Sequence, residues 1–221
     1  MRRLLFGFAL LASPLGVYAD TYAAAVRHGI DPLLFRAIAH VESNGHPWTL
    51  NIDGEPLRFQ KKSDLVTYYR HVKSRPIMLK TVRGGIYRHQ WYASALDAEA
   101  DYFNARHEDT RLRLPKDRWA VLRVVNTENV DIGAMQINWI HNGRRSGMHF
   151  EKLVDPNVNA EYAARILAGL IRQHGLWSGV GRYHSGTPWR QQAYTSKVYR
   201  AYRGFLGDAT RQSRISSDRS S

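Results

Sequence analysis

The sequence predicts a mainly α-helical protein with a small β element. Apolar residues recur at helical spacing in several segments, whereas only one segment alternates with the two-residue period of a strand hairpin. Three helix starts share one signal, in which a capping side chain precedes a proline at the first helical position: Asp31-Pro32, Asp155-Pro156 and Thr187-Pro188. The chain has 221 residues, 43% of them hydrophobic, which suffices for one globular domain with a sizeable core.

The first 19 residues predict a secretory signal peptide that is cleaved after Ala19. Arg2 and Arg3 precede an apolar stretch from Leu4 to Val17, which ends close to this small-residue site. The alternatives are an uncleaved membrane anchor and a first buried helix, and Pro14 and the shortness of the stretch argue against both. We therefore expect a periplasmic or secreted protein, with no integral membrane span after cleavage because no later run is long and apolar enough.

The next predicted element is a helix from Pro32 to Ser43. Leu34, Ile38 and Val41 recur at helical spacing, and Asn44-Gly45 supplies a stop signal. This places Glu42 in the last turn.

A hairpin follows the first helix. Trp48 to Ile52 and Leu57 to Phe59 alternate on either side of Asp53-Gly54, a dipeptide typical of two-residue hairpin turns. Weaker helical patterns run over residues 63–73 and 92–107, and in the second of these Leu96, Ala100 and Phe103 align on one face.

The last two helices follow the Asp155-Pro156 and Thr187-Pro188 signals. Their apolar stripes are Val158, Tyr162, Ile166 and Leu170 in the first, and Tyr194, Val198, Ala201 and Phe205 in the second. From Asp208 onward the chain has one large apolar residue, Ile215, so we expect residues 208–221 to be a disordered tail.

Composition excludes some chemistry and leaves other classes open. The absence of Cys excludes a disulfide scaffold, a thiolate zinc site and a cysteine nucleophile. The formal charge of +13 attracts polyanions. If the protein is exported, the anions available to it are lipid headgroups and the carboxylate-bearing peptides of the cell wall. We therefore expect no nucleic-acid partner. Solvated faces account for many of the basic residues.

Glu42 is the first candidate for catalysis. A carboxyl at the C-terminal end of an apolar helix faces the negative pole of that helix and partial desolvation, and both favour the protonated form that a general acid needs. A Glu near a helix end is usually an ordinary surface residue. Whether Glu42 is catalytic therefore depends on the motifs found elsewhere in the chain.

Three such segments follow Glu42-Ser43: Asp131-Ile132-Gly133-Ala134-Met135-Gln136-Ile137-Asn138-Trp139, Asp155-Pro156-Asn157-Val158-Asn159-Ala160, and Gly181-Arg182-Tyr183-His184-Ser185-Gly186. In this order the sequence resembles the lytic transglycosylases of the lysozyme superfamily, particularly the soluble type and the small ones associated with conjugation and secretion systems. Their pattern is a Glu-Ser pair closing a helix, a Gly-x-Met-Gln-Ile box, a helix opened by Asp-Pro, and an Ala-x-Tyr-Asn-Ala-Gly box. The resemblance covers most of residues 21–203 apart from one long insertion.

The resemblance implies a lysozyme-like fold of the goose-type or soluble lytic transglycosylase kind. Such a domain would span residues 20–207, mainly α with a small β-hairpin and an insertion at about 48–129. The insertion holds a basic stretch from Lys73 to Arg88 without any acid, which we expect to promote encounter with the anionic wall.

The resemblance also implies site residues. Glu42 would be the catalytic acid/base, with Ser43 beside it, Met135 and Gln136 lining the sugar-binding groove, and Tyr183 positioning the sugar or the acid. Each of the last three has a structural alternative: core filling for Met135, a capping or hairpin residue for Gln136, and a half-buried aromatic for Tyr183.

The sequence departs from the family pattern at His184, which stands where the family has Asn, and at Ser185, which replaces the usual Ala. A neutral imidazole offers one donor and one acceptor with a reach different from that of an amide. A substrate contact made by His184 would therefore differ in its hydrogen-bonding groups from the contact that the family makes through Asn.

The implied reaction cleaves the β-1,4 bond between N-acetylmuramic acid and N-acetylglucosamine in peptidoglycan and leaves 1,6-anhydro ends. It needs no cofactor or metal, and it would open the wall for a conjugation or secretion apparatus. Three alternatives remain: a water-using muramidase with Glu128 or Asp131 as second carboxylate, a non-catalytic wall-binding assembly protein, and a secreted nucleic-acid binder, which explains only the charge.

Overall fold

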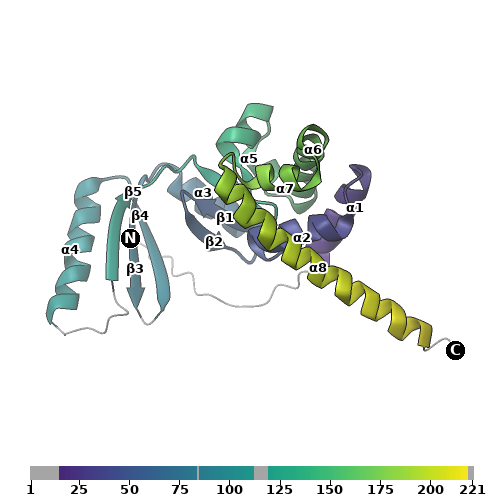
Figure 1. Cartoon of the computed structure of the whole chain (residues 1–221). Coiled ribbons are helices and arrows are strands. Elements are labelled where there is room, and N and C mark those ends of the chain that lie inside the picture. Colours follow the sequence, from purple (N-terminus) through teal and green to yellow (C-terminus); the bar gives the residue numbers. More distant parts are fainter. Residues whose placement is uncertain (1–14, 84, 112–118, 219–221) are drawn as a thin grey trace. The chain divides into compact units, whose positions relative to one another are not determined.

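The computed structural model describes residues 15–83, 85–111 and 119–218, which belong to two compact units (Figure 1). Unit 1 comprises the chain up to Pro47 and from Pro156 onward, and unit 2 comprises Trp48–Asp155. Helices dominate, as predicted, and the described strands form small antiparallel sheets in unit 2. Unit 2 begins where the insertion was predicted to begin, but it continues past residue 129 and includes the box around Gln136.

The first helices of unit 1 are α1 (Leu15–Arg27) and α2 (Pro32–Ser43), and α2 has the predicted bounds. The Asp31 carboxylate caps α2 by accepting the Leu33 N–H at 2.8 Å. Asn44 ends it in the left-handed conformation, with φ 59°, as the stop signal predicted. The predicted cleavage site at Ala19 lies within α1, whereas residues 1–14 lie outside the described part of the chain.

The remaining helices of unit 1 are α6 (Pro156–His174), α7 (Leu176–His184) and α8 (Pro188–Asp218). Pairwise packing joins the five helices in a closed ring, α1–α2–α8–α7–α6 and back to α1. The apolar face of α2, including Leu34, Phe35 and Ile38, is buried in this ring. Within the described residues we find no helix with an apolar stretch long enough to cross a bilayer.

The prediction of a disordered tail over residues 208–221 is wrong for residues 208–218, and residues 219–221 lie outside the described part of the chain. Helix α8 continues to Asp218 and extends beyond the other helices of unit 1 (Figure 1). Extending a formed helix costs much less free energy than nucleating one, and this segment contains no proline. Asp208 and Arg211 also form an i,i+3 ion pair of 2.9 Å.

The first sheet of unit 2 contains the predicted hairpin. Strands β1 (Thr49–Ile52) and β2 (Glu55–Arg58) are joined by Asp53 and Gly54, both with positive φ, as a primed two-residue turn requires. Strands β6 (Val130–Ile132) and β7 (Ile137–Asn138) complete the order β2-β1-β6-β7. Helix α3 (Lys62–Val72) follows the hairpin close to its predicted bounds.

The second sheet was not predicted. It has the order β4-β3-β5, built from β3 (Ile77–Arg83), β4 (Ile86–Tyr92) and β5 (Trp119–Val124). Helix α4 (Ala95–Arg111) packs on it through Ala98. Leu96 and Phe103, which we expected to face a core, are 76% and 58% exposed. Three short helices lie between β7 and unit 1: a π-helix η1 (Trp139–Gly143), a 3-10 helix η2 (Arg144–Ser146) and α5 (Phe150–Leu153).

A buried carboxylate holds β2 against the second sheet. Glu55 accepts from Lys80 at 2.8 Å, and its carboxylate lies 3.2 Å from His89 and 3.3 Å from Arg123. Lys80 belongs to the basic stretch expected to face the wall, but its ammonium is bound here instead. Burial alone would raise the pKa of Glu55, and the hydrogen bonds and charges of Lys80 and His89 more than offset this and hold it below its ordinary value.

We predict that acid weakens unit 2 through this cluster. Because the pKa of Glu55 is lowered in the folded state, its contribution to stability is present above its ordinary pKa of 4.5 and is lost as pH falls below it. The Glu55→Gln variant should lower the free energy of unfolding of unit 2 at neutral pH by about 2 to 4 kcal/mol. Amide hydrogen exchange in β1 and β3 measures this loss.

Glu128→Gln is the matched control, since the Glu128 side chain is 60% exposed and its ion pair among the described residues is with the exposed Arg144. Equal protection of β1 and β3 in the two variants would contradict the role given to Glu55.

Candidate active site

Glu42 lies in the last turn of α2, where the Asn44 cap ends the helix. Its side chain is only 12% exposed. The neighbouring Ser43 is buried, and its hydroxyl donates to the Ala39 carbonyl of the same helix at 3.2 Å. Helix packing thus brings one carboxyl to a mostly desolvated position at the end of an apolar helix.

His184 is the residue that the structure places beside this carboxyl. It ends α7, and its Nδ1 lies 3.7 Å from Glu42 Oε1. The imidazole is 43% exposed and is therefore open to solvent on one side. Its ring stacks on Tyr194, with centroids 4.4 Å apart and planes 2° apart. Glu42 and His184, two of the predicted site residues, therefore lie together.

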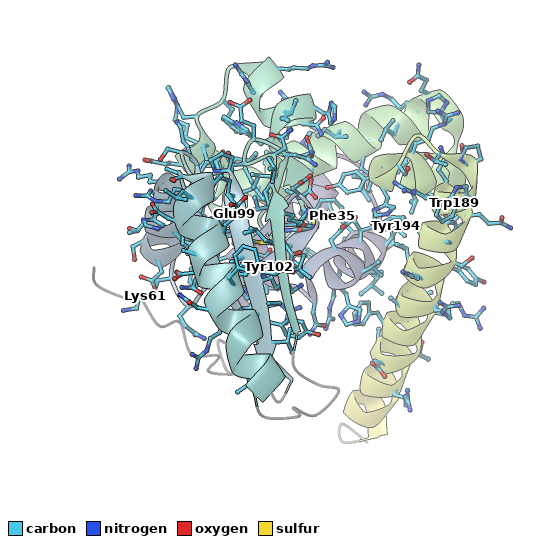
Figure 2. All side chains as sticks on the ribbon, turned by 90° about the vertical axis from the view of Figure 1, so that its left-hand side faces the viewer. Phe35, Lys61, Glu99, Tyr102, Trp189 and Tyr194 are labelled. Atoms are coloured by element: carbon cyan, nitrogen blue, oxygen red, sulfur yellow. The ribbon has the colours of Figure 1, made fainter. Side chains whose placement is uncertain are left out.

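Tyr194 is a site residue that the sequence analysis missed. It was assigned to the apolar stripe of α8, and it is indeed 4% exposed, on the side of α8 that faces Phe35 in Figure 2. Its hydroxyl, however, is buried without a hydrogen bond of standard geometry to any described residue. Burial first, and then the charge of Glu42 and a hydrogen-bonding interaction with its carboxylate that lies outside standard geometry, raise the pKa of Tyr194 well above its ordinary value. The phenol therefore stays neutral and can donate to the Glu42 carboxylate.

Two glycines set the position of α7. A Cβ atom on Gly179 would lie 2.8 Å from the backbone nitrogen of Ile171 in α6, and one on Gly181 would lie 2.9 Å from Gln191 Cβ in α8. Any larger side chain would push α7 away from one of its neighbours. This close packing fixes His184 at the end of α7.

Tyr183 belongs to the same neighbourhood. It is half-buried, and its phenol acts electrostatically on Tyr194. Its role as a residue that positions sugar or acid stays a prediction.

Met135 and Gln136 lie in unit 2, in the turn between β6 and β7, and are described within that unit. Met135 is fully buried. Gln136 has φ 47°, and its amide nitrogen donates to the Thr49 hydroxyl at 3.0 Å and to the Gly133 carbonyl at 2.8 Å. The Gln136 side chain therefore holds the turn against β1, and the Met135 side chain lies in the core. Their assignment to a sugar-binding groove stays a prediction.

The two other carboxylates considered from the sequence also belong to unit 2. Glu128 is mostly exposed and paired with Arg144 at 2.9 Å, and Asp131 accepts the Asn138 amide at 2.9 Å. Each is thus engaged in a local structural contact.

The cluster around Glu42 can perform proton transfer. It combines one desolvated carboxyl, one imidazole and one neutral phenol within unit 1. Among the described residues no group of three or more His, Asp or Glu is arranged to hold a metal ion.

Comparisons with known proteins identify no relative. No protein-family model matches this sequence, and neither a curated protein nor a solved structure matches it.

We predict that the Tyr194 hydroxyl contributes little to stability. Tyr194→Phe should leave the free energy of unfolding unchanged or raise it by up to about 1 kcal/mol, because the hydroxyl is desolvated without a standard hydrogen bond. Thermal and urea unfolding measure the effect.

The control is Tyr202→Phe on the same helix. The Tyr202 hydroxyl donates to the Asp31 carboxylate, so its removal should cost about 0.5 to 1.5 kcal/mol. A larger loss in Tyr194→Phe than in Tyr202→Phe would show that the buried hydroxyl is structural.

Proposed function

We propose that this protein is a peptidoglycan lytic transglycosylase with a lysozyme-like domain. The observation that carries the proposal is the environment of Glu42: a helix-end carboxyl, 12% exposed, with His184 at 3.7 Å and the neutral phenol of Tyr194 buried beside it. This arrangement supports the role that the sequence resemblance gives to Glu42. The order of the Glu-Ser, Met-Gln-Ile, Asp-Pro and Tyr-His segments supports the substrate class.

The reaction proceeds with one carboxyl in two roles. Protonated Glu42 donates its proton to the glycosidic oxygen between N-acetylmuramic acid and N-acetylglucosamine, and the C1–O bond breaks. The acetamido oxygen of the substrate stabilises the developing cation at C1. The Glu42 carboxylate then takes the proton of the 6-hydroxyl, whose oxygen bonds to C1. The product carries a 1,6-anhydro end, and Glu42 regains its proton.

Tyr194 and His184 support these two roles. The neutral Tyr194 phenol can donate a hydrogen bond to the carboxylate that remains after Glu42 has given up its proton. His184 lies partly exposed beside the carboxyl, at the position where the family has Asn, and its imidazole can therefore contact a bound sugar. The proposal places the enzyme in the periplasm or outside the cell, with service to a conjugation or secretion apparatus as its cellular role.

The decisive test is the chemistry of the product. Wild type should release muropeptides with 1,6-anhydro ends from purified peptidoglycan, each lighter by one water than a hydrolytic product. Glu42→Gln keeps the side-chain volume but cannot deliver a proton, so the rate should fall by about 10²- to 10⁴-fold while the fold is retained. Mass spectrometry of the soluble products and circular dichroism of the variant measure the two effects. Activity within a few-fold of wild type would overturn the assignment of Glu42.

A second test separates the transglycosylase from a water-using muramidase. A hydrolase would need a second carboxylate to hold the water, and Glu128 and Asp131 are its candidates. Because both are engaged in local contacts, we expect Glu128→Gln and Asp131→Asn to retain substantial activity. Reducing ends in quantity, together with the collapse of activity in either variant, would establish the muramidase instead. Sugar binding without any turnover in wild type would establish a wall-binding protein.

A further inference from the structure

The segment from Leu176 to Gly207, which forms α7 and the first part of α8, carries positive charge. No Asp or Glu occurs between Leu176 and Gly207, whereas this segment contains five exposed cations: Arg182, Arg190, Lys197, Arg200 and Arg203. The ion pairs found among the described residues use other cations. The charge of this segment is therefore not neutralised locally and remains available to an anionic ligand.

A shallow, open hollow lies between α7 and α8. Trp177 and Ser178 line it from α7, and Gln191, Gln192 and Thr195 line it from α8. None of its lining residues is charged. The Trp177 ring is held edge-on by Tyr199 at 5.3 Å, so the indole is fixed in orientation.

These lining groups fit a sugar ring. An indole face packs against the C–H face of a pyranose, while amides and hydroxyls donate to and accept from sugar hydroxyls and acetamido groups. The hollow is also separate from the candidate active site, since Glu42, His184 and Tyr194 do not line it.

The cations continue from the hollow along α8. Gln192, Ser196, Arg200 and Arg203 follow at spacings of three and four residues, which places them along one side of the helix. Arg203 also reaches the Tyr199 hydroxyl at 3.5 Å. A ligand with a sugar ring in the hollow would thus have its acidic substituents near Arg200 and Arg203.

We infer that the α7–α8 face is a second, non-catalytic binding site for an acidic glycan strand. The hollow takes an uncharged sugar ring, and Arg200 and Arg203 take carboxylates carried by the strand. The choice of cell-wall glycan among acidic glycans rests on the proposed function. A second attachment point keeps the enzyme near the polymer between cleavage events by raising the local concentration of substrate.

The experiment uses the full chain with Glu42→Gln as the inert parent, so that binding is measured without cleavage. Sedimentation with purified peptidoglycan sacculi gives the bound fraction at about 20 mM and about 500 mM salt. We expect Arg200→Gln/Arg203→Gln to weaken binding about fivefold or more at low salt and little at high salt. Gln192→Ala and Trp177→Ala should weaken binding at both salt concentrations.

The matched control is Arg165→Gln/Arg172→Gln, which removes the same charge from exposed positions on α6. Equal loss of binding in the control and in the α8 double variant would overturn the site, because it would show that binding depends only on the net charge of the protein. Because Trp177 packs against Tyr199, Trp177→Ala is interpreted only if its melting temperature matches that of the parent. Gln192 is exposed, and its variant tests the hollow in either case.

Two further outcomes overturn the inference or separate it from the proposed function. Tighter binding of a 20-nucleotide single-stranded DNA than of sacculi, lost in the same variants, would assign the face to nucleic acid. Wild type that cleaves peptidoglycan while sacculus binding is unchanged in all face variants would overturn the inference alone. Sacculus binding that depends on the face, without any cleavage by wild type, would overturn the proposed function alone.

Discussion

The close approach of α7 to its two neighbours is the constraint on which the candidate site depends. Gly179 and Gly181 allow α7 to pack directly against the backbone of α6 and the side chains of α8. The imidazole that ends α7 can then lie against both the α2 carboxyl and the α8 phenol. A methyl group at either glycine would push α7 away from a neighbouring helix and would change both contacts of His184, with Glu42 and with Tyr194. Backbone proximity thus determines which side chains lie beside Glu42.

Two buried polar groups, Glu55 in unit 2 and Tyr194 in unit 1, differ in what their burial contributes to stability. In unit 2 the buried Glu55 is surrounded by three basic side chains, so its charge is compensated and contributes to folding. In unit 1 the Tyr194 hydroxyl is buried without a hydrogen bond of standard geometry, which costs stability rather than adding to it. A desolvated group that folding does not need is typical of a site whose partner arrives with the substrate or appears when charge moves.

Local signals and tertiary contacts explain how far the sequence could predict this structure. The bounds of α2 followed from Asp31, Pro32 and Asn44, because capping is decided within a few residues. The Asp53-Gly54 turn predicted the hairpin for the same reason. Helix α7 and the second sheet were not predicted. Their glycines and charged residues disfavour a helix or a strand locally, and they are accommodated only by contacts with residues that are remote in the sequence. The stacking of His184 on Tyr194 likewise depends on how two helices pack, which no spacing within either helix records.

Unit 1 is assembled from two segments that are separated by the whole of unit 2, and this has a consequence for biogenesis. Helices α1 and α2 are synthesised before the other three helices of unit 1, which follow only after about 110 further residues, a delay of roughly 5 to 20 s at ordinary elongation rates. Unit 2 is continuous in sequence and has all of its residues available during that interval. The apolar face of α2 has no α8 to pack against until α8 has been synthesised. Until then the Glu42 carboxyl also lacks its neighbours from α7 and α8. A nascent chain therefore carries its candidate acid without its partners until α8 has been synthesised, which ties the assembly of the candidate site to the arrival of that helix.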